Sequence, residues 1–331
     1  MKTRKLGTAG PEVSAIGLGC MSMSGAYGPA DRRESVATVH AALDAGVTLL
    51  DTGDFYGMGH NELLLAEALQ GRPRDSYQLS VKFGALRGPD GSMLGFDGRP
   101  EAAKTSLAYS LNRLGVDHVD IYRPARLDPD VPIEDTIGAI ADMVRAGYVR
   151  HIGLSEVGAE TLRRASQVHP IADVQLEYSL LSRGIEDKVL PAARELGVAV
   201  TAYGVLARGL ISGHYDRAKL GQAGDFRGMS PRFQGENLDR NLELVEALRA
   251  VADERGASVA QIAIAWALAQ GGDIVPVIGA RSRDRLAEAL GAGDLALSAD
   301  DLAAIERAVP RGSAAGERYP AQHMAALDSE R

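Results

Sequence analysis

Short runs of apolar, often β-branched residues alternate with longer stretches of helical periodicity along almost the whole chain. A short continuous apolar run is typical of a buried strand, whereas apolar positions that recur every three or four residues indicate a helix. The strands are predicted at Ala15–Gly19, Val47–Thr52, Gln78–Phe83, His118–Arg123, Val149–Ser155, Ala172–Tyr178, Ala199–Tyr203 and Ile274–Ile278. The helices are predicted at Asp31–Ala45, Asn61–Gln70, Pro100–Leu114, Ile133–Ala146, Gly158–Gln167, Gly184–Leu196, Asn237–Glu254, Ser258–Ala269, Ser282–Leu290 and Asp300–Val309.

Strict alternation of strands and helices indicates a parallel sheet whose strands are joined by helical crossovers. The alternative to a closed barrel is an open doubly wound sheet, which usually carries a G-x-G-x-x-G motif after its first strand. The segment Gly17–Ser22 lacks the third glycine of that motif. We therefore predict an α/β fold in which residues 1–331 form a single (β/α)8 TIM barrel domain with extra C-terminal helices. Lys2–Ser14 is predicted to form an N-terminal β-hairpin before the first barrel strand.

Two stretches between predicted elements are long, polar and poorly periodic. Ala85–Arg99 and Ala207–Gly235 are rich in glycine and arginine, so we expect them to be loops at the ends of strands. The tail after Val309 is rich in alanine, glycine and charged residues, and we expect residues 310–331 to be partly disordered until something orders them.

Composition narrows the class of protein. The 331 residues include 36 Lys and Arg against 44 Asp and Glu, giving a formal charge of −8, which argues against nucleic acid as a partner. Cys20 is the single cysteine, so an intrachain disulfide and a thiolate zinc cluster are excluded, and no metal site is expected. The chain shows no secretion signal and no apolar run long enough for a membrane span. We expect a cytoplasmic protein with no membrane partner.

Candidate chemistry collects at the predicted ends of strands, where TIM barrels place their reacting groups. Asp51 lies near the end of the second strand, Tyr56 follows it, and Lys82 lies near the end of the third strand. An ammonium group that stabilises a tyrosinate would lower the pKa of the tyrosine, while the carboxylate keeps the ammonium charged. Tyr56 would then be a general acid. The alternative is a structural ion pair between Asp51 and Lys82, with Tyr56 as a packed aromatic.

Seven ordered motifs, spread over almost the whole chain, carry a resemblance to a known family. They are VTLLDTGDFYGMGHNELLLAEAL, LSVKFG, VDIYRPARLDP, YVRHIGLSE, VQLEYSLL, VTAYGVLARGL and IVPVIGARS. This series resembles the successive motifs of the aldo-keto reductases. The resemblance implies a (β/α)8 barrel that binds NADPH and reduces the carbonyl group of a small-molecule substrate.

By this resemblance Asp51, Tyr56 and Lys82 match three of the family's four catalytic residues, with Tyr56 as the proton donor. The fourth is normally a histidine, and the matching position in this chain is Ala125. Alanine donates no hydrogen bond, so another group must polarise the carbonyl or the reaction differs. Arg123 has the same strand parity as Ala125 and is our first candidate for this role. Arg126 is the second, and for both the alternative is an ordinary ion pair.

The resemblance also implies a set of cofactor contacts. Ser155 and Gln175 match residues that hold the nicotinamide amide, Tyr203 matches the aromatic that stacks on its ring, and Glu156 replaces a usual asparagine. The remaining contacts are expected from residues at other strand ends and in the glycine-rich loop after the seventh strand. They are Met21, Gly204, Arg208, Gly209, Gly279, Arg281, Arg285 and Glu288.

The arginines that follow the last strand are the reason to predict NADPH as the cofactor. Three arginines fall within Arg281–Arg285, at the start of a predicted helix, where positive charge is unfavourable unless an anion binds. The 2′-phosphate of NADPH would supply that anion, whereas the alternative is a solvated basic face.

The leading hypothesis is an NADPH-dependent oxidoreductase that converts aldehydes or ketones to alcohols. A redox-sensing or regulatory protein that binds NADPH with little turnover is the first alternative, because of Ala125. A lyase that forms a Schiff base through Lys82 is the second, although it leaves the arginines after the last strand unexplained.

Overall fold

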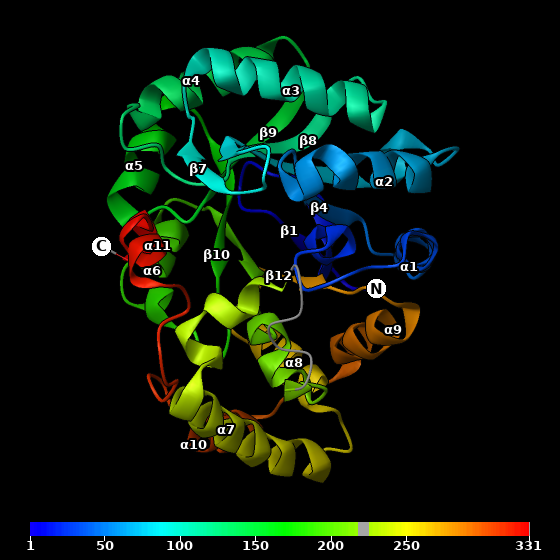
Figure 1. Cartoon of the computed structure of the whole chain (residues 1–331), viewed down its shortest axis with the longest axis vertical. Coiled ribbons are helices and arrows are strands. Elements are labelled where there is room, and N and C mark those ends of the chain that lie inside the picture. The colour runs from blue at the N-terminus through cyan, green and yellow to red at the C-terminus, as the bar shows by residue number, and fades with distance from the viewer. Residues whose placement is uncertain (218–224, 331) are drawn as a thin grey trace.

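The computed structural model of the chain describes residues 1–217 and 225–330, and its centre is a closed barrel of eight parallel strands (Figure 1). In order around the barrel the strands are β3 (Gly17–Gly19), β4 (Leu49–Gly53), β5 (Gln78–Phe83), β8 (Val119–Pro124), β9 (Val149–Ser155), β10 (Ile171–Glu177), β11 (Ala199–Tyr203) and β12 (Ile274–Gly279). β12 pairs with β3 and closes the barrel. The predicted TIM barrel is confirmed.

Helices surround the barrel and follow its strands in turn (Figure 1). Those between strands are α1 (Arg32–Asp44), α2 (His60–Leu69), α3 (Pro100–Leu114), α4 (Ile133–Arg145), α5 (Ala159–Val168), α6 (Val189–Glu195), α7 (Gly235–Glu254) and α8 (Val259–Ala269). The extra helices after the last strand are α9 (Arg283–Gly291), α10 (Ala299–Ala308) and α11 (Ala321–Ala325). Helix α3 shows how the sequence determines where a helix begins and ends. Pro100 opens its first turn, and Gly115 ends the helix in the left-handed conformation, with φ of 67°.

A β-hairpin lies at the amino end of the chain, as the sequence predicts. Strands β1 (Thr3–Lys5) and β2 (Glu12–Ser14) pair antiparallel. Leu6 and Val13 are buried in one apolar cluster with barrel residues such as Leu49. The turn needs glycine at Gly7, because φ is +63° and a Cβ there would lie 2.5 Å from the carbonyl oxygen of Gly197. The hairpin therefore packs directly on the barrel.

Two segments differ from the sequence prediction. Within the expected loop Ala85–Arg99, strands β6 (Ala85–Arg87) and β7 (Met93–Phe96) form a second hairpin. Its large apolar residues, such as Leu94, are exposed, so the alternation that normally reveals a strand is absent. The predicted helix Gly184–Leu196 is divided into a 3-10 turn at Gly184–Glu186 and α6. In one continuous helix the ring of Pro191 would meet the carbonyl group four residues earlier, and the restart at Val189 places Pro191 in a first turn instead.

The tail after Val309, which we expected to be partly disordered, packs on the rest of the protein over its described residues. Helix α11 and a 3-10 turn at Asp328–Glu330 lie in it. Asp328 accepts a hydrogen bond of 2.7 Å from the backbone N–H of Gly158, the N-cap residue of α5. Residue 331 and residues 218–224 of the expected loop Ala207–Gly235 lie outside the described residues.

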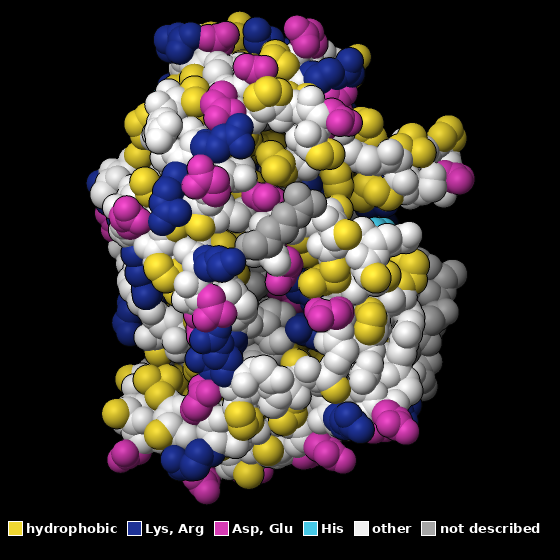
Figure 2. Space-filling model, turned by 90° about the vertical axis from the view of Figure 1, so that its left-hand side faces the viewer, with side chains coloured by type: hydrophobic (Ala, Val, Ile, Leu, Met, Phe, Trp, Pro, Cys, Tyr) yellow, Lys and Arg dark blue, Asp and Glu magenta, His cyan; other side chains and the backbone are white. Residues whose placement is uncertain are grey.

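Surface charge is mixed rather than segregated. On the face that Figure 2 shows, Lys and Arg side chains are interspersed with Asp and Glu side chains. Ion pairs such as Arg164–Glu134 and Arg163–Glu195 join neighbouring helices. No helix of the described residues is long and apolar enough to span a membrane, and no three potential metal ligands gather within the same ranges.

Candidate active site

Asp51, Lys82 and Tyr56 lie together at the carboxyl end of the barrel. Strands β4 and β5 pair so that Gly53 lies opposite Lys82. The Lys82 ammonium forms an ion pair with Asp51, and each side chain is only 6% exposed. Tyr56 begins a 3-10 turn directly after β4, and the Lys82 Nζ atom lies 5.4 Å from the centroid of its ring. The predicted proximity of these three residues is present in the structure.

Two further side chains fix the Asp51 carboxylate. Its Oδ2 atom accepts a hydrogen bond of 3.0 Å from the Ser80 hydroxyl and one of 2.8 Å from the Gln175 side-chain amide. With the Lys82 bond to Oδ1, both oxygens are occupied. A buried carboxylate needs such partners, because the desolvation of its charge is otherwise too costly. Asp51 is thus held in one orientation, and it holds the Lys82 ammonium in turn.

The pKa of Tyr56 shifts in the direction opposite to our expectation. Burial raises the pKa of Tyr56 well above its usual value, and the negative charge of Asp51 raises it further. Burial also lowers the pKa of Lys82, although its ion pair with Asp51 opposes this. The expected lowering of the Tyr56 pKa by Lys82 is therefore wrong for this arrangement, and Tyr56 is a protonated phenol at neutral pH.

Arg123 is fully buried inside the barrel and committed to other partners. Its guanidinium forms a bidentate ion pair with Asp173, with N–O distances of 2.8 and 3.1 Å. Its Nη2 atom also donates to the Ser80 hydroxyl at 2.9 Å. The structure therefore places the first candidate for the histidine's role in an interior ion pair, from which it reaches Asp51 only through Ser80.

Arg126 lies just beyond the end of β8 and is the less constrained of the two arginines. Ala125 is buried, and its backbone N–H donates to the Phe83 carbonyl at 2.8 Å, which places it beside the end of β5. Arg126 donates to the Ala125 carbonyl at 2.6 Å and has no ion pair among the described residues. The positive charge of Arg126 acts on both Tyr56 and Lys82, whose pKa values it lowers. It is a free cation beside the phenol.

The nicotinamide contacts implied by the resemblance lie on three adjacent strands. Ser155 at the end of β9 pairs in register with Gln175, and Tyr203 ends β11 on the other side of β10. The hydroxyl oxygen of Ser155 is buried and has no hydrogen-bond partner. An orphaned buried hydroxyl is unusual and costs free energy unless a ligand satisfies it. This observation fits a bound carboxamide next to Gln175.

The glycine-rich turn after β11 is built differently from our expectation for Arg208. Gly204, Arg208 and Gly209 all have positive φ, as a tight turn requires. The Arg208 guanidinium, however, donates to the Arg318 carbonyl at 2.7 Å and pairs with Glu177 at 3.4 Å. It also lies 4.2 Å from the centroid of the Tyr319 ring. Arg208 is therefore directed to the tail in this structure.

The arginines after β12 differ in how far they are neutralised. Ser282 caps helix α9, and Arg283 pairs with Glu34. Arg285 pairs with Glu288, which also accepts from His214 at 2.9 Å. Arg281 donates to the backbone carbonyls of Tyr27 and Pro29 and forms no ion pair with any described residue, although its charge lowers the pKa of Asp225.

The first and last strands of the barrel both end in glycine on the side that leads to this helix. Gly279 lies opposite Gly19 in the register of β12 and β3, and a Cβ built on Gly279 would meet nothing closer than 3.6 Å. Met21 lies two residues beyond Gly19 and is half-buried.

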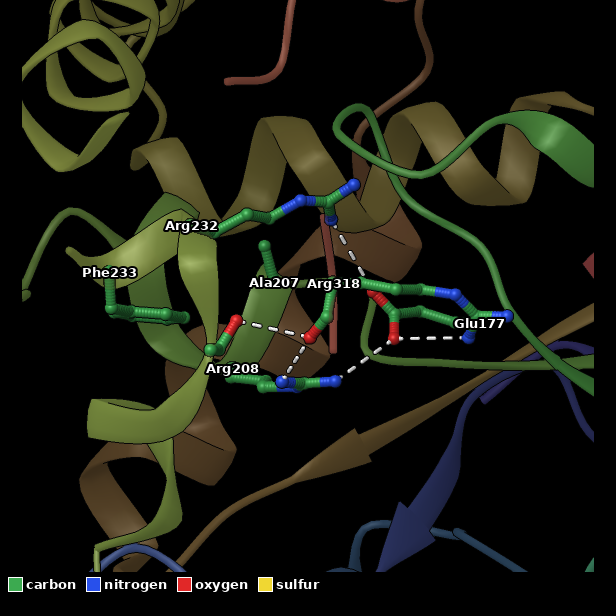
Figure 3. Close-up of a pocket in the computed structure, with 7 residues that line it drawn as sticks. Glu177, Ala207, Arg208, Arg232, Phe233 and Arg318 are labelled. Atoms are coloured by element: carbon green, nitrogen blue, oxygen red, sulfur yellow. Dashed lines mark hydrogen bonds and ion pairs between the residues drawn. The ribbon is translucent and has the colours of Figure 1, made fainter. Parts of the chain in front are cut away.

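Sequence reasoning missed a cluster of buried charges beside Tyr203. Glu177 lies opposite Tyr203 in the register of β10 and β11, and Arg208, Arg232 and Arg318 converge on it from the loop and the tail (Figure 3). Together with Ala207, Ser230 and Phe233 they line a cavity of about 10 Å³. Glu177 was detectable, because it shares strand parity with Gln175. Arg318 carries no comparable signal, since it lies in an irregular tail.

Asp54 is a second residue that the sequence did not single out. It follows β4, and its backbone N–H donates to the Lys82 carbonyl at 2.9 Å. Burial raises the pKa of its carboxyl to about 7, and the nearby Glu62 carboxylate adds to the shift. Asp54, which lies between strand β4 and Tyr56 in the chain, therefore titrates near neutral pH.

Comparisons with known proteins agree with this geometry. The sequence model of the Aldo/keto reductase family matches residues 15–310. Over 318 residues the chain is 41% identical to the "Probable aldo-keto reductase 1" of Glycine max, covering 95% of this chain and 91% of that protein.

Solved structures of other proteins are also similar to this chain. A glycerol dehydrogenase from Gluconobacter oxydans superposes with a TM-score of 0.84 at 29% identity, covering 93% of this chain and 95% of the other. An aldo-keto reductase from Bacillus halodurans in its holo form gives a TM-score of 0.78 at 27% identity, covering 98% and 99% of the two chains.

The Asp54 carboxyl makes a testable contribution to stability. Between the ordinary aspartate pKa of about 4 and the folded value of about 7, the folded state holds a proton that the unfolded state does not. The free energy of unfolding should therefore fall as pH rises from about 4 to 7. Asp54→Asn mimics the protonated form and should remove up to about 4 kcal/mol of this pH dependence.

Urea unfolding of both proteins at pH values from 4 to 8 measures the effect. Asp130→Asn, at an exposed position, is the control and should follow the wild type. A constant difference between Asp54→Asn and the wild type over this range would contradict the raised pKa.

Proposed function

This chain belongs to the aldo/keto reductase family and is an oxidoreductase of carbonyl substrates, and from that premise we propose a specific reaction. The protein reduces an aldehyde or ketone to an alcohol with NADPH as the reductant, and Tyr56 donates the proton. The observation that carries the proposal is the contact of Tyr56 with the Lys82–Asp51 ion pair, at the same end of the barrel as the orphaned Ser155 hydroxyl of β9.

The proton step follows from the state of Tyr56. Its raised pKa keeps the phenol protonated, so it is ready to donate to a carbonyl oxygen that gains negative charge. After donation the tyrosinate lies beside the Lys82 ammonium, which stabilises the new charge, and Asp51 keeps that ammonium in place. Lys82 and Asp51 thus stabilise the ionised form of Tyr56 only after the phenol has donated its proton to the substrate.

The cofactor would be held at both of its ends. When bound, NADPH supplies the hydride. Ser155 and Gln175 would hold the carboxamide, Tyr203 would support the ring, and Met21, Gly204, Gly209 and Gly279 would allow close approach along its length. At the other end Arg281, with Arg285 and the capped start of α9, would bind the 2′-phosphate, and Glu288 would face the adenosine.

Arg126 takes the part of the second donor that Ala125 cannot supply. A guanidinium beside the phenol can donate to the carbonyl oxygen together with Tyr56 and stabilise its developing charge. Arg126 has no carboxylate partner to compete with the substrate, whereas both terminal nitrogens of Arg123 are occupied inside the barrel. Arg123 then supports the site from inside the barrel, because it donates to the Ser80 hydroxyl, which in turn donates to Asp51.

Ala125 favours one other function, which is NADPH binding for redox sensing with little turnover. The arrangement of Lys82 argues against the Schiff-base alternative, because its ion pair with Asp51 holds the amine as an ammonium rather than as a free nucleophile. Oxidation of bound NADPH in a single turnover separates the reductase from the sensor.

Tyr56→Phe should abolish most of the reduction, because the ring remains and only the proton donor is lost. We expect the rate of NADPH oxidation by a panel of aldehydes to fall by about 10²- to 10⁴-fold. Stopped-flow mixing of the NADPH-loaded protein with each aldehyde measures it. Tyr109→Phe, at a position 61% exposed on α3, is the matched control. Wild type that oxidises no NADPH with any aldehyde would instead support the sensor.

Arg126→Gln should lower kcat by about 10²-fold, the loss seen when one donor to a developing oxyanion is removed. Ala125→His in the Arg126→Gln background restores a donor at the family's usual position and should recover part of the rate. Steady-state kinetics of the four proteins, with the wild type and Ala125→His alone included, measure this. Unchanged kcat in Arg126→Gln would show that another group polarises the carbonyl.

Arg281→Ala and Arg285→Ala should each weaken NADPH binding by roughly tenfold, because each removes one charge-assisted contact to a phosphate. NADH has no 2′-phosphate, so its binding should change little. Isothermal titration calorimetry with both nucleotides measures the difference. Arg283→Ala is the matched control, since Arg283 pairs with Glu34 of α1, whereas Glu288, the partner of Arg285, is itself an expected cofactor contact. Equal losses for NADPH and NADH would place the 2′-phosphate elsewhere.

A further inference from the structure

We propose that Arg318, in the C-terminal segment 310–330, is a positioning residue for the nicotinamide end of the cofactor site, acting through Glu156. This rests on the proposed function, because it assigns Arg318 a role in the NADPH site. Arg318 does not touch Ser155 but fixes the residue next to it, at the end of β9. The cofactor site would then be complete only when the C-terminal segment is in place.

Arg318 is anchored in the barrel by both its backbone and its side chain. Its side chain is only 5% exposed and pairs with Glu156, Glu177 and Glu330. Its backbone carbonyl accepts from Arg208 at 2.7 Å and from the Ser230 hydroxyl at 3.1 Å, as Figure 3 shows. The tail is therefore joined to strand ends β9 and β10 and to the loop after β11 through a single residue.

The Glu156 carboxylate depends on the tail for most of its partners. Two of its hydrogen bonds come from Arg318, at 2.6 and 3.1 Å, and a third comes from the Ser329 hydroxyl at 2.6 Å. The barrel itself supplies the backbone N–H of Glu177 at 2.9 Å. Because Glu156 is fully buried, loss of the tail contacts would leave a charge without adequate compensation.

The backbone conformation of Glu156 connects its ion pair with Arg318 to the position of Ser155. Glu156 has a φ of +54°, which is unfavourable for a residue with a side chain and persists only when its surroundings hold it. Its backbone N–H donates to the Gln175 carbonyl at 3.0 Å, and its carbonyl accepts from Ser329 at 3.2 Å. This conformation sets the direction in which the preceding residue, Ser155, presents its hydroxyl.

The electrostatics agree with the contacts. Burial alone would raise the pKa of Glu156, but the charge of Arg318 and its hydrogen bonds outweigh burial and hold the pKa well below its usual value. The pairing with Arg318 therefore favours the ionised form of Glu156.

The same segment also reaches the other side of the nicotinamide site. Arg318 Nη1 lies 3.3 Å from the Tyr203 hydroxyl, and the next residue, Tyr319, places its own hydroxyl 3.3 Å from that of Tyr203. The two residues thus contact Tyr203 directly while Glu156 connects them to Ser155. One docked segment therefore acts on Tyr203 and Ser155, two of the three residues that would hold the nicotinamide.

Binding measurements on variants of the full-length protein test this role. We expect Arg318→Gln to weaken NADPH binding by about tenfold or more, the effect of removing one partner of a buried pair. Adenosine 2′,5′-bisphosphate, which lacks the nicotinamide, should bind as it does to the wild type. Arg318→Lys, which keeps the charge without the bidentate geometry, should recover part of the affinity for NADPH. Arg311→Gln, which removes a tail ion pair with Asp187 at the surface, is the matched control.

The pathway through Glu156 predicts non-additive effects. Glu156→Gln should weaken NADPH binding, and the double variant with Arg318→Gln should bind no more weakly than Arg318→Gln alone. Additive losses, or equal losses for NADPH and the bisphosphate, would overturn the positioning role, as would unchanged NADPH binding in Arg318→Gln.

The experiment separates this inference from the proposed function. Wild type that binds neither nucleotide would refute the NADPH site itself, whereas tight binding by both wild type and Arg318→Gln would refute only the role of Arg318. Should Arg318→Gln fail to fold, Ser329→Ala replaces it. That variant removes one hydrogen bond to Glu156, and the same selective, non-additive loss is expected in smaller size.

Discussion

The site depends on a line of buried charges that crosses the interior of the barrel. The Lys82–Asp51 ion pair and the Arg123–Asp173 ion pair are both buried, and the Ser80 hydroxyl connects them by donating to Asp51 and accepting from Arg123. Removing any one of these charges would leave its partner buried and uncompensated, which is strongly unfavourable. The pair that faces Tyr56 is therefore held by a second pair that faces only the core, and this explains how Lys82 stays fixed beside the phenol.

A second group of buried charges lies on the other side of the nicotinamide site and is completed from outside the barrel. Glu156 and Glu177 belong to strand ends, but their positive partners Arg208, Arg232 and Arg318 come from a loop and from the tail. Burial would raise the pKa of both carboxylates, and the arginines of the loop and the tail lower it. The first group is internal to the barrel and supports Tyr56, the proposed proton donor. The second group joins loop residues and the tail to the place where the cofactor is proposed to lie.

The barrel was predictable because each of its elements carries a local signal. The limits of β5, β9, β11 and α3 agree with the pattern of apolar runs, Pro100 and Gly115. The contacts of Asp51 with Lys82 followed from the rule that strand ends meet on one rim. The charge cluster at Glu177 and the docked tail did not follow. Arg208 and Arg232 lie in a poorly periodic loop, and Arg318 lies in a tail 141 positions from Glu177. Nothing local in the sequence specifies such pairs.

Arg123 and Arg126 show what strand parity does and does not provide. Strand parity correctly predicts that the side chain of Arg123 points into the barrel, but it does not predict how far along the barrel axis that side chain lies. Arg123 precedes Ala125 by two positions, or about 6.5 Å of strand, and at that depth it meets Asp173 rather than the rim where a carbonyl would bind. Arg126 breaks the parity and lies beyond the last residue of β8, where the backbone turns away and its side chain returns over Ala125. The proposed role of Arg126 therefore rests on its position just past the strand, because Arg123 points into the barrel but lies too deep to reach the rim.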